Sequence, residues 1–256
     1  QITNKFSNNI DVVLGLRHDN FDTREIFSPR VAFAFKRNEN TTYRFSYGHG
    51  FRTPSFSERL IDWENAQVGY TIKGNPSLEP EISKGVNVGL EFSNMNNFQI
   101  NSLFYFNSFS NLIKSFSTEP GVFTYENIDI AYYRGLEIIT KWVISNSLSS
   151  SFTINFVENE DGDGNQLPET IPLSFGGKLS YTPNNEKTIL TTNLRAIGPY
   201  KPMEFNSSTG SYAETSKPIK AYLLGDVLLN FNINKKYNLI FGITNITNHT
   251  NSKFGP

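Results

Sequence analysis

Apolar and polar residues alternate with a period of two along much of this chain. The segment 81–94 is the clearest example, because its apolar face is interrupted only by Lys84 and its other face is small or polar. The apolar set is Ile82, Val86, Val88, Leu90 and Phe92. Successive side chains of a β-strand point to opposite faces, so this period predicts a strand with one apolar and one polar face.

The same alternation recurs and predicts about eleven strands. We place them near residues 9–20, 28–37, 41–52, 80–93, 97–115, 121–144, 148–160, 169–183, 187–200, 218–233 and 237–248. His49 falls on the apolar face of the third of these strands, near its end.

Short and long connections alternate between the predicted strands. The short connections are the turns NEN (38–40), NMN (94–96), SNS (145–147), NNE (184–186) and NKK (234–236). The long connections are 21–27, 53–79, 116–120, 161–168 and 201–217. Two rims that differ in this way are typical of outer-membrane β-barrels, which have tight periplasmic turns and long external loops.

The length of some strands supports a membrane barrel over a soluble sheet. The strands near 97–115 and 121–144 exceed the ~3–10 residues usual in soluble proteins. We therefore predict an all-β fold, an antiparallel transmembrane β-barrel meander with its apolar face toward lipid and its polar face toward the lumen. A soluble β-sandwich binding module, with the apolar face as its core, is the alternative.

Composition narrows the class of protein. The 256 residues include 22 Phe and 12 Tyr but only 2 Met, which favours strands, and no apolar run is long enough for a membrane-spanning helix. The formal net charge of −1 gives no basic surplus for nucleic acid, and the absence of cysteine excludes disulfides and thiol chemistry. No grouping of nucleophile and base is recognisable, so we predict a protein that is not an enzyme.

Four segments together resemble TonB-dependent outer-membrane receptors. YGHGFRTPSFSERL (47–60) and GNPSLEPEISKGVNVGLEF (74–92) resemble the family's strand–loop–strand segment. YENIDIAYYRGLEIITKW (125–142) places Gly135 and Glu137 at the family's Gly-hydrophobic-Glu position, and LIFGITNITNHTNSKFG (239–255) is similar to its penultimate strand and Asn-rich exit. The matches keep the family's order over nearly the whole chain.

The resemblance implies a larger protein. Receptors of this family have an N-terminal plug inside a barrel of about twenty-two strands. We therefore expect residues 1–256 to be the C-terminal portion of the barrel, about half of its wall, without the plug or the last strand. The implied partners are outer-membrane lipid, the protein's own plug and remaining strands, and TonB, which would act through the plug.

The implied activity is TonB-dependent uptake of a scarce nutrient across the outer membrane of a Gram-negative bacterium. A ferric siderophore is the leading cargo, because it is the commonest cargo class in the family, and no resident cofactor is expected. A cobalamin or oligosaccharide receptor of the same family is the runner-up. A passive porin or a barrel enzyme is the alternative from another class, although no acidic or Ser/His/Asp cluster supports an enzyme.

The loop 53–79 is the candidate binding site for the small-molecule cargo. It carries Phe56, Arg59, Trp63 and Tyr70, and Arg52 precedes it on the predicted lumen face. Aromatic and charged side chains suit a bulky, partly aromatic, charged ligand, and a lumenal arginine can pair with an anionic one. The alternatives are a loop whose rings only anchor it and an Arg52 that forms a salt bridge to a neighbouring strand or to the plug.

An acidic, Gly-rich run at 158–165 is a second candidate site. Asp161, Asp163 and Asn165 match the first three ligand positions of a calcium loop. Gln166 stands where that loop needs Gly, and Pro172 stands where it needs Glu. A solvated turn is therefore the favoured interpretation, with a surface calcium site as the alternative.

Overall fold

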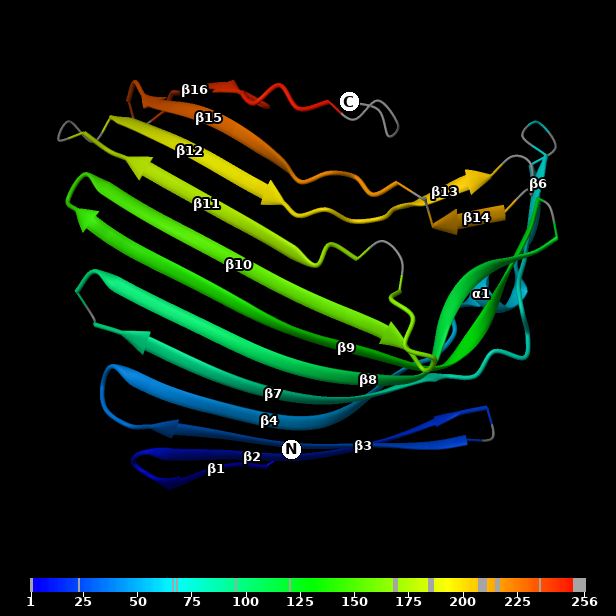
Figure 1. The fold of residues 1–256 in the computed structure, drawn as a ribbon. Helices are drawn as coiled ribbons and strands as arrows, with labels where there is room; N and C mark the ends of the chain where they lie inside the picture. Colours follow the sequence, from blue (N-terminus) through cyan, green and yellow to red (C-terminus); the bar gives the residue numbers. More distant parts are fainter. Residues whose placement is uncertain are drawn as a thin grey trace.

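The computed structural model describes residues 2–22, 24–65, 67, 69–94, 96–119, 121–167, 170–183, 187–206, 211–214, 217–234 and 236–250. Within these ranges the chain forms one curved sheet of fourteen strands, antiparallel along its main path, and a separate two-stranded hairpin (Figure 1). None of the helices in the described ranges is both long and apolar enough to cross a membrane.

The main path of the sheet follows the sequence. Its strands are β1 (Ile2–Ser7), β2 (Ile10–Phe21), β3 (Arg24–Lys36), β4 (Thr41–Arg52), β7 (Glu81–Ser93), β8 (Phe98–Glu119), β9 (Val122–Ser145), β10 (Leu148–Asp161), β11 (Leu173–Tyr181), β12 (Thr188–Ile197), β15 (Tyr222–Asn232) and β16 (Asn238–Ile243). The remaining elements belong to loops: α1 (Phe56–Leu60), β5 (Asp62–Asn65), β6 (Tyr70–Lys73), β13 (Met203–Asn206) and β14 (Ser211–Glu214).

The predicted meander and its two unlike rims are confirmed. The C-terminal ends of β3, β7, β9, β11 and β15 lie together on the left in Figure 1, and the long loop between β4 and β7 lies on the right. The NNE turn (184–186) lies outside the described residues, as do residue 95 of NMN and residue 235 of NKK. Among the described residues β1 and β16 each pair on one side only, so the sheet is an open part of a barrel.

Several predicted connections were too long, because strand pairing continues past the point where the alternation fades. β3 begins at Arg24, which pairs with Phe21 of β2, and Phe27 pairs with His18. The predicted 21–27 connection is therefore almost entirely strand. The predicted 116–120 connection was also wrong, because β8 reaches Glu119 and β9 restarts at Val122. Tertiary pairing therefore overrides the weak local pattern at this rim.

The structure also differs from the prediction at both ends and inside two loops. β1 was not predicted, and the loop ranges 53–79 and 201–217 contain short strands of their own. The last predicted strand was too long. β16 stops at Ile243 because Asn245 and Asn248 adopt positive φ, a conformation that interrupts a strand and that Asn tolerates better than most residues.

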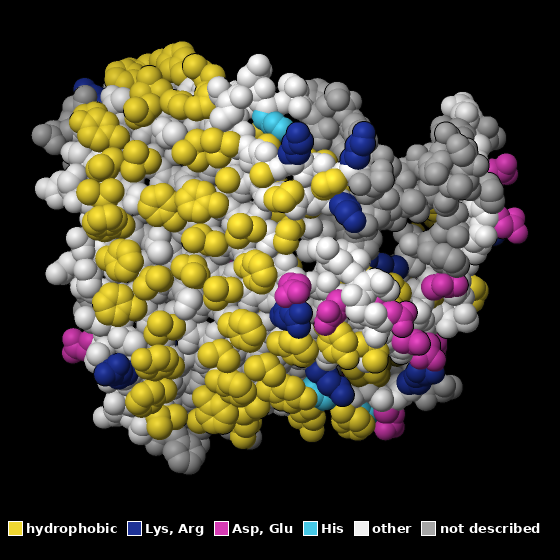
Figure 2. All heavy atoms as spheres, viewed as in Figure 1, with side chains coloured by type: hydrophobic (Ala, Val, Ile, Leu, Met, Phe, Trp, Pro, Cys, Tyr) yellow, Lys and Arg dark blue, Asp and Glu magenta, His cyan; other side chains and the backbone are white. Residues whose placement is uncertain are grey.

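The convex face of the sheet carries a wide apolar belt, as the alternation predicted. Figure 2 shows hydrophobic side chains covering this face toward the short-turn rim, and charged side chains gathering toward the long-loop rim. The apolar partners follow the register across strands, for example Phe45 with Val88 and Val88 with Phe104, and all three are well exposed. An exposed belt of this size on a single sheet is suited to lipid contact.

The belt ends along both rims with the residues expected of a membrane interface. Exposed aromatic residues lie near the short turns, namely Tyr43, Trp142, Tyr181 and Tyr237. Toward the long-loop rim the outward positions change to His49 on β4, Lys84 on β7, Arg134 on β9 and Glu158 on β10. The segment of β7 from Lys84 to Phe92 is nine residues long, which agrees with the ~9–11 residues that a tilted transmembrane strand needs to cross the bilayer.

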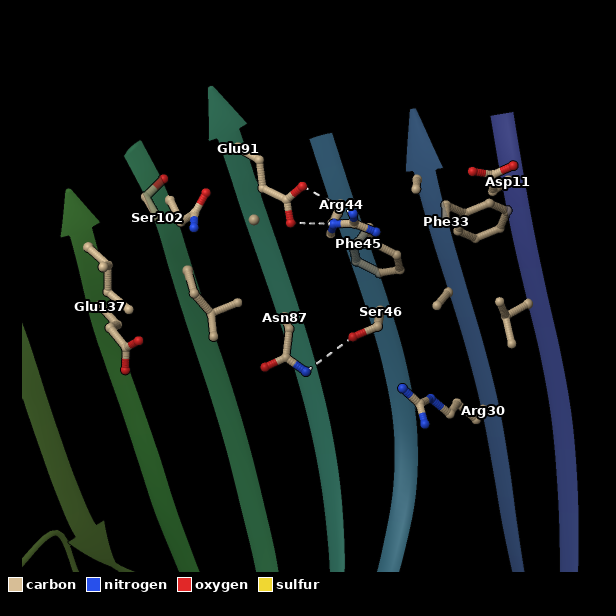
Figure 3. Close-up of a pocket in the computed structure, with 17 residues that line it drawn as sticks. Asp11, Arg30, Phe33, Arg44, Phe45, Ser46, Asn87, Glu91, Ser102 and Glu137 are labelled. Carbon is tan, nitrogen blue, oxygen red and sulfur yellow. Dashed lines mark hydrogen bonds and ion pairs between the residues drawn. The ribbon is translucent and has the colours of Figure 1, made fainter. Parts of the chain in front are cut away.

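The concave face is polar and hollow. A cavity of about 630 Å³ extends across β2, β3, β4, β7, β8 and β9, and Asn87, Gly89 and Glu91 line it (Figure 3). Arg44 donates from Nε to Glu91 at 2.6 Å, and Asn87 donates to the Ser46 hydroxyl at 3.2 Å. A cavity that crosses six neighbouring strands requires a concave surface, so the predicted inward set of the 81–94 segment is confirmed.

Gly135, in the predicted Gly-hydrophobic-Glu position, has a packing role. Tyr105 lies opposite it on β8, and a Cβ on Gly135 would come within 2.5 Å of the Tyr105 ring and of the Phe156 carbonyl oxygen. Glycine therefore lets the tyrosine lie flat across β9 on the lumen side. A ring that covers a strand glycine in this way also protects its backbone from water.

Candidate functional site at the mouth of the barrel

The loop between β4 and β7 is ordered by a short helix at its start. Ser55 caps α1, because its hydroxyl accepts from the Glu58 backbone N–H at 3.2 Å. Glu58 in turn accepts from the Ser55 backbone N–H at 2.7 Å, which completes a capping box. The sequence S-F-S-E therefore determines where the loop turns back over the barrel.

Arg52 ties this helix to the barrel wall. Its Nε and Nη2 donate to the two carboxylate oxygens of Glu81 on β7, at 2.8 and 2.7 Å. Its Nη1 donates to both carboxylate oxygens of Glu58 on α1, at 2.9 and 3.1 Å. These bonds, from Glu81 first and Glu58 second, raise the pKa of Arg52 further above its usual range. We call Arg52, Glu58 and Glu81 the clasp.

The clasp also reaches β8. Glu81 Oε1 accepts from the backbone N–H of Ile113 at 2.8 Å, so the carboxylate joins β4, β7 and β8. The Glu81 side chain is only 11% exposed and that of Glu58 16%, while Arg52 is 45% exposed. The bond from Arg52 is the main cause that lowers the pKa of Glu58 below its usual range.

The end of the loop is anchored separately through Glu79. Asn127 on β9 accepts from the Glu79 backbone N–H at 2.9 Å and donates to the Glu79 carbonyl at 3.0 Å. The Glu79 carboxylate accepts from Arg24 on β3 and from Asn111 on β8. The Arg24 bond is the main cause that lowers the pKa of Glu79. The segment L-E-P-E therefore docks the loop with two carboxylates placed on either side of Pro80.

Close packing fixes the rest of the loop base. Leu78 is 4% exposed, and Pro54 and Pro80 are buried. Gly74 faces the backbone of α1 so closely that a Cβ there would lie 2.5 Å from the carbonyl carbon of Arg59. Such a contact can be relieved only by moving backbone, so Gly74 allows the loop to fold onto its own helix.

Aromatic contacts connect the tip of the loop to β9. Trp63 on β5 meets Tyr70 on β6 edge to face with ring centroids 5.4 Å apart, and Tyr70 meets Phe123 on β9 in the same way at 6.1 Å. β6 also pairs with β9 in parallel, through Thr71 with Val122 and Ile72 with Phe123. This arrangement fastens the loop tip to the projecting β8–β9 hairpin.

The apolar side chains that remain open are on α1 and β5. Phe56 is 79% exposed, Leu60 55% and Trp63 44%, and no residue of α1 is buried. In Figure 1 α1 lies behind the projecting β8–β9 hairpin, which it contacts, on the side of the sheet opposite the convex face shown in Figure 2. The loop therefore presents rings at the mouth of the barrel on a base that is held by ion pairs.

A second cavity, of about 760 Å³, lies next to the clasp. Arg52, Arg30, Arg17 and Phe51 contribute to its walls. Arg17 pairs with Asp19 at 2.7 Å, so part of this positive charge is compensated. A volume of this order is within the range of ~300–1,000 Å³ usual for small-molecule sites.

The five predicted site residues are brought to one rim but not to one surface. Arg52 is part of the clasp. Arg59 lies within the loop base, where it pairs with Asp22 at 3.4 Å and donates to the Pro76 carbonyl at 3.1 Å. Tyr70 supports Trp63, and the aromatic rings of the set that are exposed are Phe56 and Trp63. Arg52 forms ion pairs with Glu58 and with Glu81 on the neighbouring strand, as the salt-bridge alternative expects, and its contact with an anionic cargo stays a prediction.

Sequence reasoning missed Glu58, Glu81 and Asn127. The capping-box spacing of Ser55 and Glu58 was a readable signal for Glu58. No local signal marked Glu81 or Asn127, because their partners lie 29 and 48 residues away along the chain.

The acidic run forms a closed turn around one carboxylate. Asp161 Oδ1 accepts from the backbone N–H of Asn165 at 2.8 Å and of Asp163 at 3.0 Å, and the bond from Asn165 is the main cause that lowers the pKa of Asp161. In the described part of the chain no group of three or more His, Cys, Asp or Glu side chains is placed to hold a metal ion. The turn interpretation explains these contacts, and the calcium site stays a prediction.

Comparison with known proteins gives matches to one family. The family model described as TonB dependent receptor-like, beta-barrel, matches residues 1–246. The iron-regulated outer membrane virulence protein of Vibrio cholerae is 29% identical over 171 residues, which cover 60% of this chain. The match covers 26% of that relative, so the chain corresponds to about a quarter of its length.

Solved structures share the fold at low sequence identity. A ferric enterobactin receptor of Pseudomonas aeruginosa aligns with a TM-score of 0.78 and 17% identity, over 95% of this chain and 38% of that chain. The siderophore receptor PirA of Acinetobacter baumannii aligns with a TM-score of 0.78 and 15% identity, over 96% and 40%. The copper transporter OprC aligns with a TM-score of 0.75 and 15% identity, over 96% and 40%.

Proposed function

The chain belongs to the TonB-dependent receptor β-barrel family, and we propose on that premise that it forms part of the wall and the mouth of a receptor that imports a scarce nutrient. The family and the similarity to an iron-regulated outer membrane protein indicate the outer membrane of a Gram-negative bacterium. This membership agrees with the prediction of a transporter and not an enzyme.

We further propose a ferric siderophore as the cargo. Support comes from the names of similar proteins, which include a ferric enterobactin receptor, a siderophore receptor and an iron-regulated protein. The fold alone does not select the cargo, because a copper transporter has the same architecture. Cobalamin or an oligosaccharide therefore remains the runner-up, to be separated by a binding experiment.

The observation that carries the proposal is the loop 53–79 itself. It is fastened at both ends by ion pairs and leaves the Phe56 and Trp63 rings exposed, and Arg52 at its start lines a cavity of about 760 Å³. Rigid aromatic groups lose little conformational entropy when they contact a bulky ligand. In this proposal Phe56 and Trp63 contact the cargo, while Arg52, Arg59 and Tyr70 hold them in position.

The remaining partners follow from the same premise. The two edge strands β1 and β16 would pair with the rest of the barrel, since an open edge is not tolerated in lipid. The polar concave face would receive the plug of the full-length receptor, and TonB would act on that plug.

The proposal is tested by titrating the full-length receptor with ferric catecholate, ferric hydroxamate, cobalamin and a linear oligosaccharide. If a ferric chelate is the cargo, it alone should bind tightly, and the double variant Phe56→Ala/Trp63→Ala should weaken binding at least about tenfold. Phe27→Ala is the matched control, because its ring is exposed near the same rim but stacks on His18 on the convex face.

Two results would count against this proposal. Tight binding of cobalamin or the oligosaccharide, with no ferric chelate bound, would replace the cargo. Unchanged affinity in the double variant, with heat-modifiable gel mobility confirming a folded barrel, would move the binding surface away from the loop 53–79.

A further inference from the structure

Lys84 is the residue that interrupts the apolar face of β7. By register its side chain points to the convex face with Val86, Val88 and Leu90, and it is exposed. The structure assigns it no ion-pair partner within the described part of the chain. An outward lysine on a lipid-facing strand is costly near the middle of the bilayer and is tolerated near its border, where the amine can reach the headgroups.

Its neighbours across the sheet are polar on the same face. Lys84 is paired in register with His49 on β4 and with Ser108 on β8. The His49 ring is held by the Tyr47 hydroxyl, with 2.6 Å between the hydroxyl oxygen and Nε2. The next outward row toward the short turns is Tyr47, Val86 and Phe106. The polar row of Lys84 crosses the convex face near the long-loop rim, with Val86 and Val88 on its short-turn side and Ile82 beyond it.

The charges further along the border are compensated. Arg134 on β9 pairs with Glu158 at 2.9 Å and with Glu160 at 3.8 Å on β10. Lys84 differs because the strands beside it supply a histidine and a serine, and no carboxylate. Figure 2 shows Lys, Arg and His side chains along this border of the hydrophobic surface. Lys84 is thus an exposed positive charge on the convex face to which no ion pair is assigned among the described residues.

We propose that Lys84, together with His49 and Ser108, binds the phosphate group of an outer-leaflet lipid and thereby sets the height of this wall in the membrane. The long-loop rim is the external one in such barrels, so the headgroups at Lys84 belong to the outer leaflet. The acyl chains would lie over the exposed row of Phe45, Val88 and Phe104 beneath. An ammonium group near a surface of anionic headgroups is attracted by about 1 kcal/mol, or about fivefold in affinity.

The test uses the full-length receptor in a neutral detergent, titrated with lipid A and with dephosphorylated lipid A while thermal unfolding is followed. Wild type should be stabilised by lipid A at lower concentrations than by the phosphate-free lipid. Lys84→Ser should need about fivefold more lipid A for the same shift. Lys84→Arg should retain the wild-type response, because it keeps the charge and the reach.

Lys178→Ser is the matched control, because it removes the same charge from the cavity on the concave face. It should respond to lipid A as wild type does. The proposal is overturned if Lys84→Ser and wild type respond alike, or if the phosphate-free lipid stabilises wild type as well as lipid A does. It is also overturned if Lys84→Ser changes the oligomeric state without lipid, since the occupant would then be protein.

Discussion

The clasp ties α1 to the barrel wall through the Glu58 carboxylate, which can be neutralised without changing the size of the side chain. In Glu58→Gln the side chain keeps its size but loses its charge. The Glu58 carboxylate makes two bonds to Arg52 Nη1 and accepts one from Ser55. The bonds from Arg52 to Glu81 and the β4–β7 ladder are unchanged, so the substitution should release α1 and leave the wall intact.

The size of the effect follows from exposure. Hydrogen bonds to charged groups contribute ~1.5–3 kcal/mol when shielded, but exposed ion pairs contribute only ~0.2–1 kcal/mol. Arg52 is 45% exposed and Glu58 16%, so an intermediate value applies. Weakening the capping box adds a further loss. We expect local opening of α1 to become easier by about 1–2 kcal/mol, which corresponds to about 5–30-fold faster exchange of its protected amides.

The assay is amide hydrogen exchange of peptides covering residues 55–61 in the full-length receptor. Glu91→Gln is the matched control, because Glu91 makes a similar bidentate pair with Arg44 that lies inside the wall. It should leave exchange at residues 55–61 unchanged. If Glu58→Gln also leaves exchange there at the wild-type rate, the clasp does not hold the loop and the argument fails.

The pH dependence gives a second measurement of the same contact. The pKa of Glu58 is lowered in the folded protein, so its contribution is present above the usual glutamate pKa of about 4 and is lost as the pH falls through the lower folded value. Exchange at residues 55–61, corrected for its intrinsic pH dependence, should therefore rise in wild type only below about pH 4. In Glu58→Gln the increase should already be present at neutral pH.

Two further predictions concern the wall and the base of the loop. Val88→Arg should impair barrel stability by ~2–4 kcal/mol because it places a charge in the lipid-facing belt, whereas Asn87→Arg on the lumen face should fold, as judged by heat-modifiable gel mobility. Equal mobility of both variants would refute the assigned faces. Gly74→Ala should loosen α1, because the new Cβ meets backbone at 2.5 Å, while Gly164→Ala, with open space at a positive φ, should leave α1 protected. If α1 exchanges equally fast in Gly74→Ala and Gly164→Ala, the close contact of Gly74 with the α1 backbone does not hold the helix in place.

Local pattern was sufficient for the faces of the wall. The alternation around Val88 and Glu91 has one solution in an extended chain, because a period of two fixes which side chains share a face. The order of the strands followed from the same pattern, since short turns can join only neighbouring antiparallel strands. The resemblance to a known family added the expectation of a larger barrel and of a mouth loop that binds cargo.

Strand ends could not be predicted as well, because they depend on partners. β8 and β9 continue for many residues beyond the apolar belt, since they stay paired as far as Glu119 and Val122, with irregularities at Asn111 and between Ser117 and Glu119. Conversely, β16 stops at Ile243, although we predicted a strand as far as residue 248, because two asparagines turn the chain away. The alternation of apolar and polar residues arises because one face of the strand meets lipid. Where both faces of a strand meet water, the alternation is lost and no longer marks the strand end.

The roles within the candidate site were decided by tertiary structure. The sequence placed Arg52 on the lumen face, where it could pair with cargo, plug or strand. The fold brings Glu81 against it from 29 residues away and Glu58 from the first turn of a helix that exists only in the folded loop. A guanidinium group pairs with whichever carboxylates the register brings within reach, and register between distant strands is a property of the whole sheet. The chain thus encoded its faces and turns locally, whereas the clasp arose only when the strands were paired.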